Sequence, residues 1–158
     1  MKFVRVSHDA DPWPSSVLDP QPYLDALPDL SAQLPAGARA FAVDPSHYDL
    51  SSMRCVKDLR FASVTVVEGG HAKLSVEIRL ERNAFKHDAG LTVLYDDVIG
   101  LSVEAGAQGD RRIWPDTPRL GDVQLDEILP HGHGCTHEVK LTGGSILVVS
   151  RDLHAEWK

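Results

Sequence analysis

The stretch LRFASVTVVEGGHAKLSVEIRLE, residues 59–81, decides the fold. Within residues 71–81 the apolar side chains fall on one face of an extended chain and the polar ones on the other; the apolar positions are Leu74, Val76, Ile78 and Leu80. This period of two is typical of a half-buried antiparallel strand. Residues 59–68 predict its partner strand, and Gly69-Gly70 can supply both positive-φ residues of a tight hairpin.

Downstream of this hairpin the period of two continues. It predicts strands at residues 91–95, 98–104, 122–129, 136–142, 145–150 and 153–157. Gly143-Gly144 predicts a second tight hairpin. Because no helix separates these strands, we expect an antiparallel meander rather than parallel βαβ units.

Upstream, residues 2–7 predict a short strand and residues 9–16 a loop. Asp19-Pro20 is a helix start, since a carboxylate can accept free amide protons and proline already has a helical φ. One helical face follows it, formed by Tyr23, Leu27, Leu30 and Leu34. Pro28 predicts a kink, or two helices that meet at Leu27, and Pro35 with Gly37 predicts the end of the helical segment.

The predicted fold class is α+β and predominantly antiparallel β. We expect a curved sheet or two-layer sandwich of about seven or eight strands, with one N-terminal kinked helix or helix pair. Residues 1–158 form a single domain in this interpretation, in which the helical segment 1–58 packs on the meander 59–158.

Composition restricts the function. The 158 residues include 16 Lys and Arg against 23 Asp and Glu, a formal charge of −7. This charge disfavours nucleic acid and favours either a basic partner or solubility alone. No apolar run approaches the roughly 18 residues of a membrane-spanning helix, and the first residues lack the apolar core of a signal peptide. Two cysteines cannot form a disulfide framework, so a reducing cytoplasm is expected.

The densest group of metal-ligand side chains is the segment HGHGCTH, residues 131–137. On an extended chain its alternate residues share a face, which would gather His131, His133, Cys135 and His137. Imidazole and thiolate are the ligands that Zn²⁺ prefers, so one interpretation is a zinc site. The other is a tight turn between two strands, marked by Pro130, Gly132 and Gly134, with polar histidines.

Acidic residues recur where the predicted strands begin and end, and Trp and Tyr occur in Pro-containing loops. A partner-binding surface built from them would use Trp13, Tyr48, Asp96, Asp97, Trp114, Asp126 and Glu127. The structural alternative is that the charges protect strand edges and that the aromatic rings fix the loops to the core. No nucleophile elbow, phosphate-binding loop or dinucleotide glycine pattern occurs, so no catalytic residue is assigned.

The C-terminal part carries a resemblance. Leu125-Asp126-Glu127-Ile128, His137-Glu138-Val139 and the ending Asp152-Leu153-His154-Ala155-Glu156-Trp157 resemble small β-rich bacterial proteins of unassigned function, several of which are thought to be immunity proteins of polymorphic or contact-dependent toxin systems. The resemblance covers about residues 59–157. It implies a cytoplasmic, non-enzymatic protein that blocks a cognate toxin without a cofactor.

Three hypotheses follow. The first is an acidic, non-enzymatic protein-binding module of the immunity type, with a basic toxin as partner and no nucleic acid or membrane. The second is a metal-dependent enzyme or metal-binding protein that uses residues 131–137, with Zn as cofactor. The third is a homo-oligomeric β-protein whose sheet edge pairs with a copy of itself, which leaves monomer and homodimer both open.

Overall fold

The central hairpin is present in the computed structural model, which describes residues 1–9, 15–106 and 118–158. Strand β3 (Arg60–Glu68) pairs antiparallel with β4 (Leu74–Glu81), and Val66 lies opposite Val76. The alternation within β4 buries its apolar side chains and exposes most of its polar ones, as the sequence predicts. The alternation of apolar and polar residues therefore predicted both the strand and the face that it buries.

The turn of this hairpin differs from the prediction. Gly69 still belongs to the ladder, because its N–H donates to the carbonyl of Lys73 at 2.7 Å. The positive φ angles fall on His71 (62°) and Ala72 (56°), so the assignment of both to Gly69-Gly70 was wrong. Because the hydrogen-bonded ladder extends to Gly69 and Lys73, the chain reverses at residues 70–72 and not at residues 69–70.

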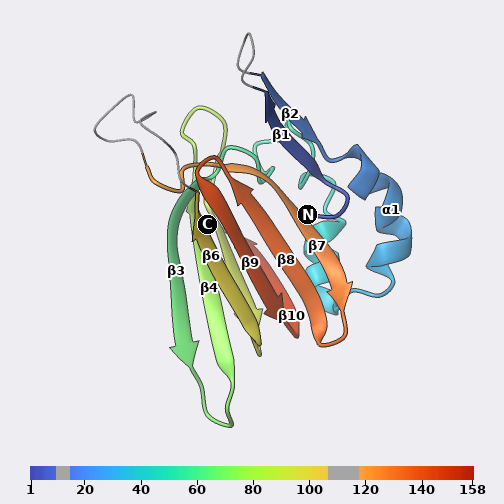
Figure 1. Cartoon of the computed structure of the whole chain (residues 1–158), viewed down its shortest axis with the longest axis vertical. Helices are drawn as coiled ribbons and strands as arrows, with labels where there is room; N and C mark the ends of the chain where they lie inside the picture. The colour runs from blue at the N-terminus through green and yellow to red at the C-terminus, as the bar shows by residue number, and fades with distance from the viewer. Residues whose placement is uncertain (10–14, 107–117) are drawn as a thin grey trace.

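Eight strands form two four-stranded antiparallel sheets (Figure 1). The β3 sheet has the order β10-β5-β4-β3, and the β7 sheet has the order β6-β9-β8-β7. The other strands are β5 (Leu91–Asp96), β6 (Gly100–Ala105), β7 (Val123–His131), β8 (Gly134–Leu141), β9 (Gly144–Ser150) and β10 (Asp152–Trp157). The α+β, predominantly antiparallel class is confirmed.

The chain changes sheet twice, so its topology is not one continuous meander. It leaves β5 at Asp97, whose φ of 53° turns it toward β6. It returns after β9 at Arg151, whose N–H donates to the carbonyl of Asp96 at 3.0 Å. As a result β10 pairs with β5, with Trp157 opposite Leu91. Periodicity predicts strands but not such long-range partners, and the meander expectation was wrong at these two points.

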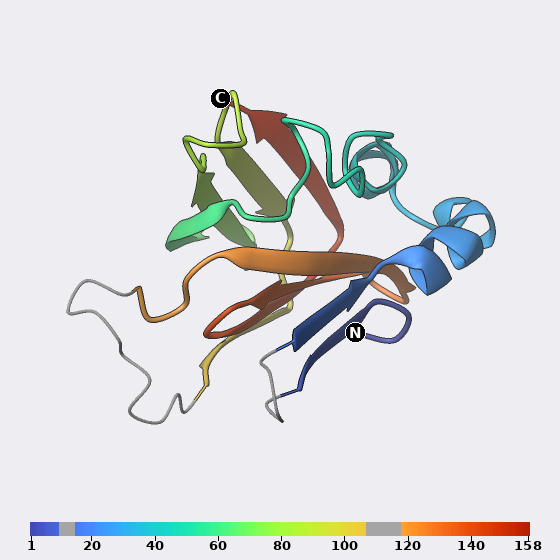
Figure 2. The ribbon, with the colours of Figure 1, turned by 90° about the horizontal axis from the view of Figure 1, so that it is seen from above.

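The core lies between the two sheets (Figure 2). Ile78 and Val93 project into it from the β3 sheet, and Val139 and Ile146 project from the β7 sheet. The buried apolar residues belong to one continuous cluster that also includes residues of both helices. The free energy gained when this apolar surface is removed from water is the main contribution that holds the two sheets together.

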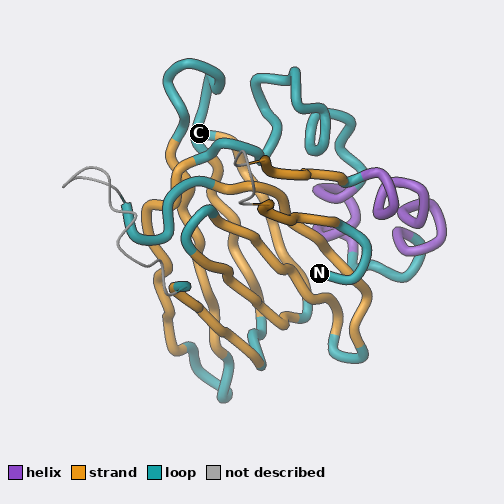
Figure 3. Tube along the Cα trace, turned by 45° about the horizontal axis from the view of Figure 1, so that its top comes forward, coloured by secondary structure: helices purple, strands orange, loops and turns teal. Residues whose placement is uncertain are grey.

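Two helices lie together beside the sheets, shown in purple in Figure 3. Helix α1 (Gln21–Ser31) continues through Pro28 and buries Tyr23 and Leu27, which confirms the predicted face but not a break at Leu27. Helix α2 (Ala36–Ala42) begins after Pro35, so this proline starts a helix instead of only ending one. The predicted helix pair is thus present, with its junction later than expected.

Helix α2 is fixed against β10. The carboxylate of Asp152 accepts hydrogen bonds from the N–H groups of Gly37 (3.1 Å) and Ala38 (2.9 Å). A Cβ at Gly37 would lie 1.9 Å from the carbonyl oxygen of Leu153, so only glycine allows this approach. The helix therefore covers the outer edge of β10, an edge that would otherwise be open to another strand.

The N-terminal residues form a separate hairpin. Strand β1 (Arg5–Asp9) pairs antiparallel with β2 (Ser15–Asp19), and Val6 lies opposite Leu18. The expected first strand is present but begins later. The loop expected at residues 9–16 overlaps the end of β1 and the start of β2, and β2 was not predicted. In the part of the chain that the structure describes, neither helix has the length and apolar character needed to cross a bilayer.

Candidate functional site

The most concentrated group of ionisable side chains is a buried network centred on Asp126 of β7. The carboxylate contacts Nε2 of His47 at 2.8 and 2.9 Å and Nε2 of His137 at 2.8 Å. Asp126 is 1% exposed, and both histidines are buried with it. The three residues come from the loop after α2, from β7 and from β8, so the network joins three separate segments.

The contacts of Nδ1 in each histidine indicate which protonation state satisfies its hydrogen bonds. Nδ1 of His47 donates to the carbonyl of Phe41 at 2.9 Å, so both nitrogens of this ring face acceptors and an imidazolium satisfies both. Nδ1 of His137 lies 2.7 Å from the hydroxyl of Tyr95, which can donate to it, so a neutral ring satisfies this site. One carboxylate, one imidazolium and one imidazole leave the network without net charge.

Burial and the Asp126 charge shift the pKa values of these groups. Burial raises the pKa of Asp126, but the charge of His47 and the hydrogen bonds from both histidines outweigh it and lower it well below 3.8. Burial lowers the pKa of His47, but Asp126 and the Phe41 carbonyl outweigh it and raise it above 6.5. Burial, with Asp126, raises the pKa of Tyr95 well above 10. These shifts favour the carboxylate form of Asp126 and the imidazolium form of His47.

This network is closed to substrates. The cavity beside Asp126 and His137 has a volume of about 10 Å³, which is at most the space of one water molecule. Tyr48 is buried beside the network, and its hydroxyl donates to the backbone carbonyl of Asp126 at 3.1 Å. Buried charged groups with complete hydrogen bonding fix one arrangement of the surrounding segments. We interpret the network as structural: its hydrogen bonds hold the loop after α2, which carries His47, against the strands β7 and β8.

The network predicts a pH dependence of stability. The raised pKa of His47 contributes stability that is complete below about pH 6.5 and is lost as the pH rises through the folded-state value. We expect the free energy of unfolding, measured with urea, to fall between pH 6 and pH 9. The variant His47→Gln should remove this fall. Burial lowers the pKa of His87, so this residue affects the pH dependence of stability only below about pH 6.5. If the free energy of unfolding of His47→Gln still falls between pH 6 and pH 9, His47 is not the source of the pH dependence.

The four predicted metal ligands do not converge. His131 and Gly134 pair at the ends of β7 and β8, so the chain reverses between His131 and His133. Nε2 of His133 lies 2.8 Å from the carbonyl of Asp97, and Cys135 is buried with its Sγ 3.7 Å from the Ser150 hydroxyl. Among the described residues, no group of three or more His, Cys, Asp or Glu side chains is arranged so that it could hold a metal ion. The turn between the two strands is present, and the four side chains named in the zinc alternative do not gather on one face.

The predicted partner-binding residues divide into three groups. Trp13 and Trp114 lie outside the described residues. Tyr48, Asp126 and Glu127 are buried and hold the fold together, so they offer a partner no surface in this structure. Asp96 and Asp97 remain at the surface beside the β5–β6 turn, where both pair with Arg151.

Glu127 has an internal role that its charge does not suggest. Its side chain leaves β7 on the face opposite to Asp126 and accepts the N–H groups of Lys2 (2.5 Å), Phe3 (2.6 Å) and Val4 (2.7 Å). The N-terminal amine of Met1 contacts the carboxylate of Glu138 on the neighbouring strand. The N-terminal segment thus covers this face of the β7 sheet.

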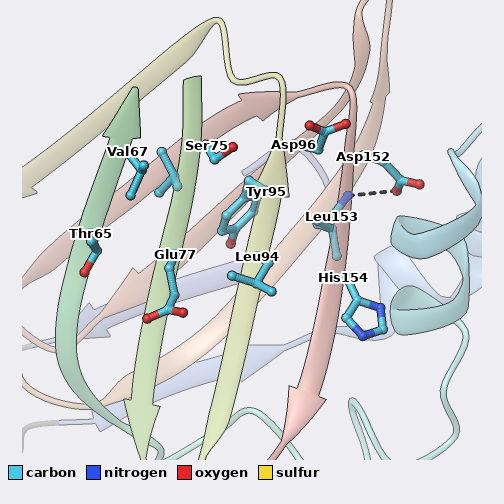
Figure 4. A pocket seen from close by; sticks show the side chains of 11 residues that line it. Thr65, Val67, Ser75, Glu77, Leu94, Tyr95, Asp96, Asp152, Leu153 and His154 are labelled. Atoms are coloured by element: carbon cyan, nitrogen blue, oxygen red, sulfur yellow. Dashed lines mark hydrogen bonds between the residues drawn. The ribbon is translucent and has the colours of Figure 1, made fainter. Parts of the chain in front are cut away.

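The outer face of the β3 sheet carries an open hollow of about 530 Å³ (Figure 4). Its apolar floor includes Leu94 and Val67, which are 43% and 55% exposed. The carboxylates around it belong to Glu77, Asp96 and Asp152, and none of the described Lys or Arg residues lines it. The hollow combines an apolar surface with negative charge, and its size lies within the range of ligand sites.

A second hollow, of about 740 Å³, lies on the same face nearer the β4–β5 connection. Among its charged lining residues the basic ones predominate, with Arg79, Arg82 and Lys158 against Glu81. Because Glu77 and Arg79 are alternate residues of β4, the acidic and the basic hollow are neighbours. The face therefore presents two regions of opposite charge along its strands.

Comparison with protein-family models, with curated proteins and with solved structures finds no match to this chain. The geometry is thus the basis for a functional conclusion. No local pattern identifies His47 or Tyr95 as partners of the Asp126 network, because both are distant in sequence. One signal exists: adjacent strand residues project to opposite faces, so either Asp126 or Glu127 has to point inward and needs an internal partner.

Proposed function

We propose that this chain is a non-enzymatic binding module that docks a basic protein and neutralises it, as an immunity protein neutralises its toxin. The observation that carries the proposal is the acidic hollow on the outer face of the β3 sheet. It is open, apolar at its floor and lined by Glu77, Asp96 and Asp152. The overall charge of −7 acts in the same direction, since it attracts a cationic partner at long range.

The hollow suits a Lys or Arg side chain. Such a side chain has a long aliphatic stem and a charged end, and it can bury the stem while the charge stays near solvent. Leu94 provides an apolar contact for the stem. The partly exposed Glu77 carboxylate can accept the charge, but it already lies 3.6 Å from Nε of Arg79, so a bound cation shares Glu77 with Arg79 or displaces it. Asp96 contributes less, since it already pairs with Arg151, and Asp152 is engaged by the start of α2.

The placement of the acid–base groups also supports binding. Histidines and carboxylates that act on a substrate have to reach it. Asp126, His47 and His137 are buried between the sheets, with room for at most one water molecule beside Asp126 and His137. The neutralising role and the cytoplasmic location extend the resemblance of residues 59–157 to immunity-type proteins.

The experiment starts with the partner. The purified chain, coupled to a resin, captures proteins from a lysate of its source organism, and the captured basic protein is purified for calorimetric titration. We expect the affinity to fall as salt rises from 50 to 300 mM, because surface charges contribute to the encounter. We also expect co-expression of the chain to restore growth of cells that produce the captured protein. Affinity without protection would retain the binding role and reject neutralisation.

A charge reversal tests the hollow itself. Glu77→Lys should weaken binding of the captured partner at least tenfold, or about 1.4 kcal/mol, because it replaces a hydrogen-bond acceptor with a positive charge that repels the basic partner. The matched control is Glu104→Lys, an exposed residue of β6 with the same change in net charge. If both variants bind as the unmodified chain does, or are weakened equally, the hollow is not the docking site.

A further inference from the structure

The free edge of β3 differs from the covered edge of β10. The pair Gly69–Lys73 is hydrogen-bonded, and hydrogen-bonded positions alternate along an antiparallel ladder. Val67 and Thr65 therefore direct their N–H and C=O groups toward β4, and Val64, Val66 and Glu68 direct theirs outward. Within residues 1–9, 15–106 and 118–158, no backbone or side-chain hydrogen bond is made to this outer edge from Val64 to Glu68.

The same segment lacks the features that normally prevent strand pairing. Residues 61–67 contain no charge and no proline, whereas natural edge strands are usually interrupted by one or the other. Val66 and Val67 project to opposite faces and are 49% and 55% exposed. A β-branched strand with free backbone groups and apolar side chains on both faces fits another strand of the same kind.

We propose that this edge pairs with the same edge of a second copy of the chain, antiparallel across a two-fold axis at Val66. In this register Val66 faces its own counterpart and Val64 faces Glu68 of the other copy. All three outward residues on each strand then find partners, which gives six backbone hydrogen bonds. The proposal is independent of the toxin-binding function and goes beyond it.

The shape of the molecule allows this pairing. The tip of the β3–β4 hairpin extends past the ends of the neighbouring strands (Figure 1). Val66 lies opposite Val76, two residues before the end of β3. Because the two strands run in opposite directions from Val66, the bodies of the two copies lie on opposite sides of the axis. The two Glu68 side chains are about 13 Å apart along the strands, at roughly 3.3 Å per residue, so their repulsion is small.

The product is one continuous sheet of eight strands, in the order β10-β5-β4-β3 followed by β3-β4-β5-β10 of the second copy. A two-fold arrangement closes on itself, so it stops at a dimer. The pairing involves one short strand from each copy and buries little area. We therefore expect a dissociation constant on the order of 100 µM, in the range of weak interfaces.

Sedimentation equilibrium of the full chain between 5 µM and 1 mM tests the proposal. The average mass should rise from 17.3 kDa toward twice that value. Val66→Lys should remain a monomer throughout, because it places two cations opposite each other on the axis. The control Val103→Lys, at an exposed site on β6 of the other sheet, should associate like the unmodified chain.

A cross-link provides a second measurement that does not depend on a charge. Opposed residues of a hydrogen-bonded pair have Cα atoms about 5.5 Å apart, within the range of a disulfide. Val66→Cys should form a disulfide-linked dimer under mild oxidation, and Val103→Cys should not; the native Cys55 and Cys135 are buried. A monomer at 1 mM overturns the proposal, as does association of Val66→Lys or failure of the Val66→Cys cross-link.

Discussion

Asp126→Ala should lower the free energy of unfolding by about 3–5 kcal/mol, which is a large part of the stability of a domain of this size. The substitution leaves the His47 imidazolium buried without its counter-charge and removes the acceptor of His137. Urea unfolding followed by circular dichroism at pH 6 measures the loss. At this pH the ion pair is fully formed, because Asp126 is ionised and His47 is protonated.

The matched control is Asp96→Ala. Asp96 also pairs with a cation, Arg151, but both side chains are about half exposed. Exposed ion pairs contribute roughly 0–1 kcal/mol, so this variant should unfold almost as the unmodified chain does. Equal losses for the two variants would show that burial of the Asp126 network does not determine its energy.

Glu127→Ala should have the second largest effect, a loss of about 2–4 kcal/mol. Three backbone N–H groups lose a charged acceptor, and each such bond contributes roughly 1.5–3 kcal/mol. The loss is smaller than the sum because the released segment regains hydrogen bonds to water. Hydrogen exchange provides a local measurement: the amides of Phe3 and Val4 should lose their protection while those of β8 retain most of theirs.

Glu156→Ala serves as the control for this variant, since Glu156 is about half exposed and contacts only Lys158 through its charge. It should leave both the stability and the exchange of the N-terminal amides unchanged. Continued protection of Phe3 and Val4 in Glu127→Ala would contradict the role of Glu127 as the anchor of this segment.

The parts of the fold that could be predicted are those encoded by local periodicity. The alternation in residues 71–81 identified β4 and its buried face, and the spacing from Tyr23 to Leu27 identified the buried side of α1. Helix α2 is only seven residues long and rich in Ala and Gly, so it has too few turns for a periodic signal. Strand partners that are distant in sequence, such as β5 and β10, leave no trace in either strand alone.

The site predictions failed for a related reason. Asp126 and Glu127 are adjacent charges in a strand, so one of them has to point inward, but the strand itself does not show which residues surround either carboxylate. Here the N-terminal segment covers the face from which Glu127 projects, and this depends on a contact more than 120 residues apart in sequence. His131 and His133 would share a face only in one uninterrupted strand, whereas the turn after His131 separates them. Asp96 lies beside a turn and stays at the surface, and its role in binding a partner stays a prediction.

The return of the chain to the β3 sheet after β9 affects how the protein is made. Strand β10 is synthesised after β5 and after the strands of the β7 sheet, so the β3 sheet lacks this edge strand until residues 152–157 leave the ribosome. Until then the start of α2 also lacks Asp152, its hydrogen-bond acceptor. Nascent chains therefore pass through a stage in which one edge of β5 is unpaired, and the synthesis of residues 152–157 supplies both missing contacts.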